Sequence, residues 1–394
     1  MHPVRFLLAS LGSRGDIEPC AAIGRELQRR GHDVTMAVPP NFIGFVESAG
    51  LHGVGHGSDQ VVHNSNIERK YGTTVNPITE AWEIYSHLTQ LWPELATSLA
   101  SLANGADLLL TDASEQGLAA NVAEYYDIPQ AALHIFPLGP ESTDSQITKE
   151  IEAGQRRTLG LPEESGSAPR RALEIQAYDE LFFPGLAAEW ANQDVRRPFV
   201  GGLTLELPAI ADEDVSTWIA AGTPPIYFGF GSSVRLPSAA ETAAVINAAC
   251  TRLGERALIC TGVSDFTGVP EFDNLKIVNT VNHAAVFPAC RAVVHHGGPG
   301  TTFAGIRAGV PTLALSVSVD QPLWAQAVNF LEVGVGRPFF EATLDTLIAD
   351  LRTILTPHCV SRTREVAAQM ATPTESAAAA AGLLEEAAER GSVS

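Results

Sequence analysis

The sequence is poor in positive charge. Its 394 residues include 25 lysines and arginines against 45 aspartates and glutamates, so its formal net charge is −20 at pH 7. Nucleic acids and anionic membrane surfaces attract proteins through positive charge. The composition therefore argues against a nucleic-acid partner and allows at most transient contact with a membrane.

Cysteines and long hydrophobic runs are also scarce. The five cysteines are scattered, and no two have the spacing of a metal site or a redox motif. We therefore expect free thiols in a reducing compartment and no metal site. No apolar run reaches the ~18 residues of a transmembrane helix. The apolar start, residues 1–12, is too short for a signal peptide and predicts a first strand. These absences together predict a cytoplasmic, soluble protein.

Strand-like and helix-like segments alternate along most of the chain. Predicted strands lie at 4–11, 33–38, 107–111, 130–136, 225–230, 256–261, 276–281, 291–294 and 312–317. Predicted helices include 19–30, 42–49, 80–103, 116–126, 239–253, 322–331, 361–370 and 376–389. This βαβ rhythm predicts an α/β fold with parallel, doubly wound sheets, and the length suits two domains.

We expect one domain over residues 1–205, a linker over 206–223 and a second domain over 224–370. A final helix over 371–394 is expected to pack on the first domain. The acidic run Asp212-Glu213-Asp214 is expected to be a solvated loop rather than a metal site. In such folds, ligands bind at the carboxyl ends of the strands, here in a cleft between two sheets that face each other.

The most informative segment is His295-His296-Gly297-Gly298-Pro299-Gly300-Thr301-Thr302. It joins a predicted strand to a predicted helix, and the first N–H groups of a helix bind anions such as phosphate. It is not a P-loop, because no lysine follows Gly300, and it lacks the third glycine of a dinucleotide fingerprint. Imidazoles and hydroxyls beside the glycines favour a phosphate site over a turn whose glycines serve packing alone.

Other predicted strands also end in polar residues. Gly12-Ser13-Arg14-Gly15-Asp16 follows the first strand, and Asp16 is either a helix cap or a general base. Gly231-Ser232-Ser233 is a second glycine turn with hydroxyls. Asp320-Gln321 combines a carboxylate with an amide, which together accept from and donate to vicinal hydroxyls. Phosphate turns together with a hydroxyl clamp indicate a nucleotide-sugar.

Five motifs in this order carry a family resemblance: GSRGD, YFGFGSS, VNH, HHGGPGTT and DQP, which begin at residues 12, 227, 281, 295 and 320. They resemble those of the bacterial family-one, GT-B-fold glycosyltransferases of natural products, such as the glycopeptide-antibiotic and macrolide enzymes. The segments NVAEYYDIP and FPGLAAEW are similar to the mycobacterial branch, which includes glycopeptidolipid deoxysugar transferases.

The resemblance implies two Rossmann-like domains and metal-independent, inverting transfer of a hexose or deoxyhexose. The donor would be a dTDP- or UDP-linked sugar, with no further cofactor, and the acceptor a hydrophobic natural product or lipopeptide. The resemblance implies that the donor diphosphate is bound by His296, Gly298, Gly300, Thr301 and Ser232, with Ser13 and Arg14 near the phosphates. It implies that Val281 binds the base and that Asp320 and Gln321 bind the sugar. It implies that Asp16 removes the proton of the acceptor hydroxyl.

The sequence departs from the family pattern at three places. Pro299 replaces a common alanine and removes a backbone donor, and Ala284 replaces a common glutamine. Thr261-Gly262-Val263 stands where an aromatic residue stacks on the base.

Two other classes of function remain open at this point. One is a nucleotide-sugar epimerase, which needs no acceptor. The other is a catalytically silent protein that binds a nucleotide-sugar or a lipid. Several aromatic residues of the first domain are either ordinary core or the lining of an acceptor pocket: Trp82, Tyr85, Trp92, Phe136, Phe182 and Phe183.

Overall fold

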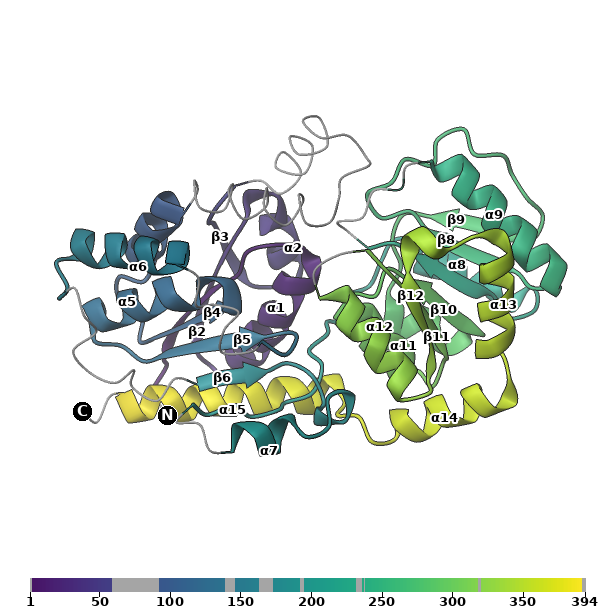
Figure 1. The fold of residues 1–394 in the computed structure, drawn as a ribbon. Coiled ribbons are helices and arrows are strands. Elements are labelled where there is room, and N and C mark those ends of the chain that lie inside the picture. The colour runs from purple at the N-terminus through teal and green to yellow at the C-terminus, as the bar shows by residue number, and fades with distance from the viewer. Residues whose placement is uncertain are drawn as a thin grey trace. The chain divides into compact units, whose positions relative to one another are not determined.

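The computed structural model describes residues 2–58, 92–138, 146–162, 173–191, 195–231, 236, 238–317 and 320–391. Its contacts divide the chain into two compact units (Figure 1). One unit contains Met1–Leu205 and Ala371–Ser394, and the other contains Glu206–Met370. The chain therefore returns to its first unit after completing the second.

The first unit is built on a six-stranded sheet with the order β3-β2-β1-β4-β5-β6, in which all neighbours are parallel. Leu8 on the central strand is fully buried, as the apolar run of the sequence predicts for a parallel sheet covered on both faces. The strands are β1 Arg5–Ala9, β2 Asp33–Val38, β3 His52–Gly55, β4 Leu108–Asp112, β5 Gln130–His134 and β6 Leu173–Gln176.

Helices cover this sheet. They are α1 Arg14–Arg29, α2 Ile43–Ser48, α5 Gln116–Tyr126, α6 Gln146–Leu159, α7 Leu186–Trp190 and α15 Pro373–Gly391, with residues 92–102 also helical. The C-terminal helix α15 packs against α1. Glu385 of α15 accepts from Arg30 Nη1 at 2.6 Å, and its other oxygen lies 2.9 Å from His32 Nε2. These contacts hold the last helix on the first unit.

The second unit has a six-stranded parallel sheet of its own, with the order β12-β11-β10-β7-β8-β9. The strands are β7 Ile226–Gly229, β8 Ala257–Cys260, β9 Leu275–Val278, β10 Ala292–His295, β11 Thr312–Ser316 and β12 Gly334–Pro338. The helices are α8 Asp212–Ala220, α9 Ala239–Leu253, α10 His283–Val286, α11 Pro299–Arg307, α12 Gln321–Phe330, α13 Leu344–Ile354 and α14 Pro357–Ala367.

Each sheet changes its direction of winding at one point. In the first unit this point lies between β1 and β4, and in the second between β7 and β10. Loops that leave the carboxyl ends of two such strands diverge to opposite faces and leave a crevice, where ligands bind in α/β folds. The loops after these four strands are therefore the places to look for a site in each unit.

Three helical segments differ from the expectation. Helix α1 begins at Arg14 rather than at Pro19, because Ser13 and Asp16 form a capping box that starts the helix earlier. The acidic run at Asp212 is the first turn of α8 rather than a loop. Negative charge in the first turn stabilises a helix through its dipole. Residues 139–171, rich in serine, threonine, glutamate, glycine and proline, are expected to mix loop with short helix, and Gln146–Leu159 within them form the longer, 14-residue helix α6.

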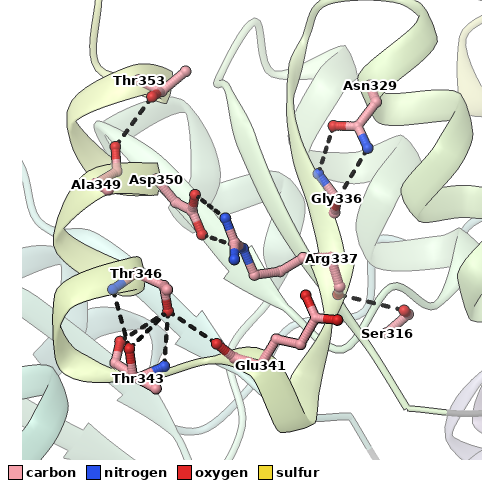
Figure 2. Close-up of polar contacts among 10 residues, drawn as sticks. All are labelled: Ser316, Asn329, Gly336, Arg337, Glu341, Thr343, Thr346, Ala349, Asp350 and Thr353. Carbon is pink, nitrogen blue, oxygen red and sulfur yellow. Dashed lines mark hydrogen bonds and ion pairs between the residues drawn. The ribbon is translucent and has the colours of Figure 1, made fainter.

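The edge strand β12 is held by side chains from the helices on either side of it (Figure 2). Asn329 at the end of α12 bonds to both backbone groups of Gly336, at 2.8 and 2.9 Å. A Cβ at Gly336 would lie 2.1 Å from the Ala325 carbonyl oxygen, so glycine is needed for this approach. On the other side Arg337 forms a two-pronged ion pair with the buried Asp350 of α13, at 2.6 and 2.8 Å. These contacts fix α12, whose first residue follows Asp320.

Candidate functional site

The turn between β10 and α11 has the geometry of an anion site. Helix α11 starts at Pro299, four residues earlier than the sequence predicts, with Gly298 as its N-cap. Gly300 and Thr301 therefore lie in the first turn of the helix. The N–H groups of this turn have no acceptor within the helix and form the positive end of its dipole. Pro299 occupies the first helical position, which proline favours. The N–H that it lacks is thus one that the helix itself could not use.

His295 is fully buried at the end of β10. Its Nδ1 accepts a hydrogen bond from the Gly297 N–H at 3.0 Å, so the ring proton must sit on Nε2. That Nε2 is buried and has no hydrogen-bond partner in the described part of the chain. Burial holds the pKa of His295 well below its ordinary value. The ring is therefore neutral, fixes the turn with one nitrogen and offers a proton with the other.

His296 is the second imidazole of the turn. Burial lowers its pKa to about 4, against a hydrogen bond with the Gly229 backbone that raises it. Its Nδ1 has no partner among the described residues. Both histidines are thus neutral near pH 7, which the sequence left open. Neither ring contributes a positive charge in this state, so both would meet an anion as hydrogen-bonding groups.

One further strand end packs against His296, and a second packs against the first. A Cβ at Gly231, after β7, would lie 2.5 Å from the His296 Cε1, and one at Gly298 would lie 2.5 Å from its Nε2. A Cβ at Gly262, after β8, would lie 2.1 Å from the Gly231 carbonyl oxygen. Gly231 and Gly262 also have positive φ, of +76° and +56°. The turns after β7, β8 and β10 therefore meet closely at the point where the sheet changes direction.

Ser232, expected to help bind a diphosphate, lies outside the described residues, as does Ser233. Gly231, which precedes Ser232, lies against the His296 ring.

Asp320 and Gln321 lie beside this turn, after β11. Gln321 Oε1 accepts from the Val317 N–H at 2.8 Å, and a Cβ at Gly297 would lie 3.2 Å from the Gln321 Cβ. Asp320 is the N-cap residue of α12, and its Oδ2 accepts from Trp324 Nε1 at 3.1 Å. Burial raises the pKa of Asp320 to about 6, although this bond lowers it. The predicted acid–amide pair is therefore adjacent to the predicted phosphate turn.

Val281 follows β9, which is the second strand beyond β7 in the sheet. Its side chain is buried in an apolar cluster with Tyr227 and Phe287. The next residue, Asn282, caps α10 and receives support from Asp212, whose Oδ1 accepts the Asn282 N–H at 2.8 Å. Because neighbouring strands are ~4.8 Å apart, Val281 lies roughly 10 Å along the sheet edge from the end of β7.

In the first unit, Ser13, Arg14 and Asp16 lie together at the start of α1. Asp16 Oδ2 accepts from the Ser13 N–H at 2.7 Å and from the Ser13 hydroxyl at 3.0 Å. Arg14 forms an ion pair with Glu18 at 2.7 Å and lies 4.9 Å from the Phe45 ring centre. The N-cap of α1 is Ser13, not Asp16, which instead occupies the third helical position of the capping box. The Arg14 charge already has a protein partner.

Sequence reasoning missed Asp112, the last residue of β4. Its Oδ2 accepts from the Leu11 N–H at 2.7 Å and so holds the loop that leads to Asp16. Burial and the nearby charge of Glu115 raise its pKa to about 6. Glu115 in turn pairs with the buried His56 at 2.9 Å. The signal was available, because Asp112 directly follows the predicted strand 107–111, and the other candidates also lie at or shortly after the ends of predicted strands.

The aromatic residues expected to be either core or the lining of an acceptor pocket differ in their burial. Phe182 is 2% exposed and therefore belongs to the core. Trp92, Phe136 and Phe183 are half-buried. Trp82 and Tyr85 lie outside the described residues.

The described residues contain no cluster of three or more histidine, cysteine or acidic side chains that could hold a metal ion. All five cysteines are free and buried. Within the same described segments, none of the helices combines the length and apolarity needed to cross a membrane.

Comparison with known proteins identifies both units. Residues 6–137 match the model of the glycosyltransferase family 28 N-terminal domain. Residues 258–384 match that of the erythromycin biosynthesis protein CIII-like C-terminal domain. An uncharacterized glycosyltransferase of Mycobacterium tuberculosis is 53% identical over 98% of this chain and 100% of its own.

More distant relatives agree with this match. The vancomycin aglycone glucosyltransferase of Amycolatopsis orientalis is 29% identical over 98% of each chain. The crystal structure of the glycosyltransferase VinC in complex with dTDP matches with a TM-score of 0.69 and 18% identity, over 98% of this chain and 100% of that one. The chain is therefore a glycosyltransferase of the GT-B fold, a member of the family that includes these mycobacterial and antibiotic glycosyltransferases.

Proposed function

We propose that this glycosyltransferase transfers a hexose or deoxyhexose from a nucleotide diphosphate sugar to a hydroxyl of a hydrophobic natural product or lipopeptide. The transfer inverts the anomeric carbon and needs no metal ion. The observation that carries the proposal is the carboxyl edge of the second sheet. There a helix N-terminus, two neutral buried imidazoles and an acid–amide pair converge where the sheet changes its direction of winding.

The donor diphosphate is assigned to the β10–α11 turn. The N–H groups of Gly300 and Thr301 donate to its oxygens, and the helix dipole stabilises its charge. His296 can donate its single ring N–H to a phosphate oxygen in place of the Gly229 backbone, and Ser232 adds a hydroxyl donor. Ser13 and Arg14 of the first unit remain candidates for the same phosphates. His295 holds Gly297 and thereby the shape of the turn. Such oriented donors stabilise the leaving diphosphate as the glycosidic bond breaks.

The remainder of the donor is assigned to the two neighbouring strand ends. The Asp320 carboxylate accepts from sugar hydroxyls, and the amide of Gln321 donates to a sugar oxygen. The backbone at Val281 receives the nucleotide base on the other side of the diphosphate. The solved dTDP complex of VinC makes dTDP, or the related UDP, the expected nucleotide.

The chemical step is a single displacement. The acceptor hydroxyl gives its proton to the Asp16 carboxylate, its oxygen bonds to the anomeric carbon, and the bond from that carbon to the diphosphate oxygen breaks. The nucleotide diphosphate leaves with the electron pair. Asp112, through the Leu11 N–H, holds the loop that leads into α1 and so to Asp16. Membership of a glycosyltransferase family leaves the epimerase alternative without support.

A thermal-shift series with dTDP, UDP and GDP, each alone and as its glucose ester, tests the donor class. A ligand present at 100 times its dissociation constant stabilises the folded state by about 2.7 kcal/mol. We therefore expect the melting temperature to rise by several degrees with dTDP or UDP and not with the matching nucleoside. A series in which no diphosphate raises it would contradict the proposal.

Chelation tests the metal-free mechanism. Because the donor diphosphate is assigned to N–H groups and imidazoles, dialysis against EDTA should change the rate of sugar transfer less than twofold. Full loss of transfer, restored by adding Mg²⁺, would show that a metal ion supports the leaving group.

A further inference from the structure

The indole of Trp324 connects the two halves of the donor site. Trp324 lies one helical turn after Asp320 and is completely buried. This spacing brings its Nε1–H to the Asp320 Oδ2, at 3.1 Å. Its ring meets that of Phe303 edge to face, with centroids 5.0 Å apart. Phe303 belongs to α11, the helix whose first turn is assigned to the diphosphate.

The Asp320 carboxylate is not spent on capping its own helix. An aspartate at this position ordinarily accepts from an N–H two or three residues later. Helix α12 has no such side-chain cap, and Asp320 has helical backbone angles, with φ −81° and ψ −19°. The side chain bonds to Trp324 instead. Its orientation is therefore set by the indole and by the backbone N–H of Asp320 itself, rather than by the N–H groups of the first helical turn.

A buried carboxylate needs donors to remain charged. Burial raises the pKa of Asp320 to about 6, and the Trp324 hydrogen bond works against that increase. In the neighbouring turn, burial lowers the pKa of His296 to about 4 and that of His295 well below its ordinary value. Neither histidine therefore changes charge in the range where Asp320 does.

We propose that Trp324 is a positioning residue for the donor sugar. Its N–H fixes one oxygen of Asp320, so that the other oxygen accepts from the sugar hydroxyls. Its ring packs edge to face on Phe303 of α11, the helix whose first turn is assigned to the diphosphate, so the indole that holds Asp320 is itself held in place. This inference rests on the proposed function of the site.

The test compares free nucleotides with their sugar esters. Trp324→Phe keeps an aromatic ring against Phe303 and removes the N–H. We expect its affinity for dTDP-glucose or UDP-glucose, measured by calorimetry at pH 7, to fall about tenfold. Its affinity for dTDP or UDP should change less than twofold, because these lack the sugar that Asp320 contacts. Phe303→Leu removes the aromatic pair, keeps the indole N–H, and serves as the control for packing alone.

A pH series gives a second readout that simple packing would not change. In the wild type, affinity for the glucose ester should fall as the pH drops through about 6, because a protonated Asp320 no longer accepts from two hydroxyls. Trp324→Phe loses a bond that lowers the Asp320 pKa, so its midpoint should move to higher pH. The control is Asp320→Asn, whose affinity for the glucose ester should show no such midpoint. The free diphosphate is not a control in this series, because its own terminal phosphate titrates at about pH 6.

The outcomes separate the two ideas. Equal loss of diphosphate and glucose-ester binding in Trp324→Phe, or no loss of either, overturns the positioning role. A sugar-selective loss in Phe303→Leu as large as that in Trp324→Phe also overturns it, because packing would then suffice. If the wild-type protein binds none of the nucleotides, the proposed function itself is wrong.

Discussion

Replacing Asp16 by asparagine should leave donor binding intact and lower the rate of sugar transfer by roughly 10²–10⁴-fold, the usual contribution of a general base. The amide cannot take the proton of the acceptor hydroxyl. Its oxygen can still accept from the Ser13 N–H, as Asp16 Oδ2 does at 2.7 Å, so the start of α1 should persist. The measurement is the initial rate of product formation together with the dissociation constant for dTDP or UDP.

Asp16→Ala separates the base from the cap. Alanine removes the proton acceptor and the capping bond together, so it should be as inactive as Asp16→Asn but less stable, by about 1 kcal/mol. If Asp16 serves only to cap α1, the two variants should differ in activity. Asp16→Asn would then transfer sugar at a near-normal rate, and only Asp16→Ala would lose activity, in proportion to its lost stability.

Much of the fold could be predicted from local patterns. Strand β2 and helices α5 and α9 begin and end where the sequence indicates, because each combines a clear apolar period with a stop such as Pro39, Asp127 or Gly254. Asp127 and Gly254 both adopt the left-handed conformation that ends a helix. In these elements, local and tertiary preferences agree.

The strands that escaped prediction lie on the flanks of the sheets. Strands β3 and β12, at the edges, have the sequences His-Gly-Val-Gly and Gly-Val-Gly-Arg-Pro, without the apolar run that marks a central strand. Strand β6, also at an edge, contains Glu174, whose charge is compensated by Arg197 at 2.6 Å. The ion pair joins residues far apart in the sequence, so local patterns cannot reveal it.

The candidate site shows the same division. Position at a strand end and chemical type were enough to select His296, Asp320 and Gln321, which the structure brings together in the second unit. The ring proton of His295 and the bond between Trp324 and Asp320 were not predictable. Both depend on which backbone or side-chain group folding places opposite a given atom.

The second large effect is expected at Gly298. Its φ of −65° suits any residue, so Gly298→Ala introduces no backbone strain, but its Cβ would lie 2.5 Å from the His296 Nε2 and must displace the ring. A hydrogen bond to a charged group contributes about 1.5–3 kcal/mol, so we expect donor affinity to fall roughly 10- to 150-fold. Wild-type affinity in this variant would remove His296 from the diphosphate site.

Gly300 and Gly305, on the same helix, provide a sharper comparison. Apart from its own helix, a Cβ at Gly300 would meet no atom of the described residues within 4 Å, so alanine there is expected to harm only a ligand that occupies that space. A Cβ at Gly305 would lie at an ordinary 3.6 Å from Val293, away from the turn. Gly305→Ala should bind the donor normally and, as a glycine-to-alanine change within a helix, gain up to about 1 kcal/mol of stability.

Calorimetric titration of the wild-type protein and these three alanine variants with dTDP and UDP tests most directly whether the β10–α11 turn holds the donor diphosphate. We predict that the wild type and Gly305→Ala bind one of the two nucleotides equally well. Gly298→Ala and Gly300→Ala should bind it at least tenfold more weakly, with the melting temperature of Gly300→Ala no lower than that of the wild type. Equal affinity in all four proteins, or no binding by the wild type, would contradict the assignment of this turn to the donor diphosphate.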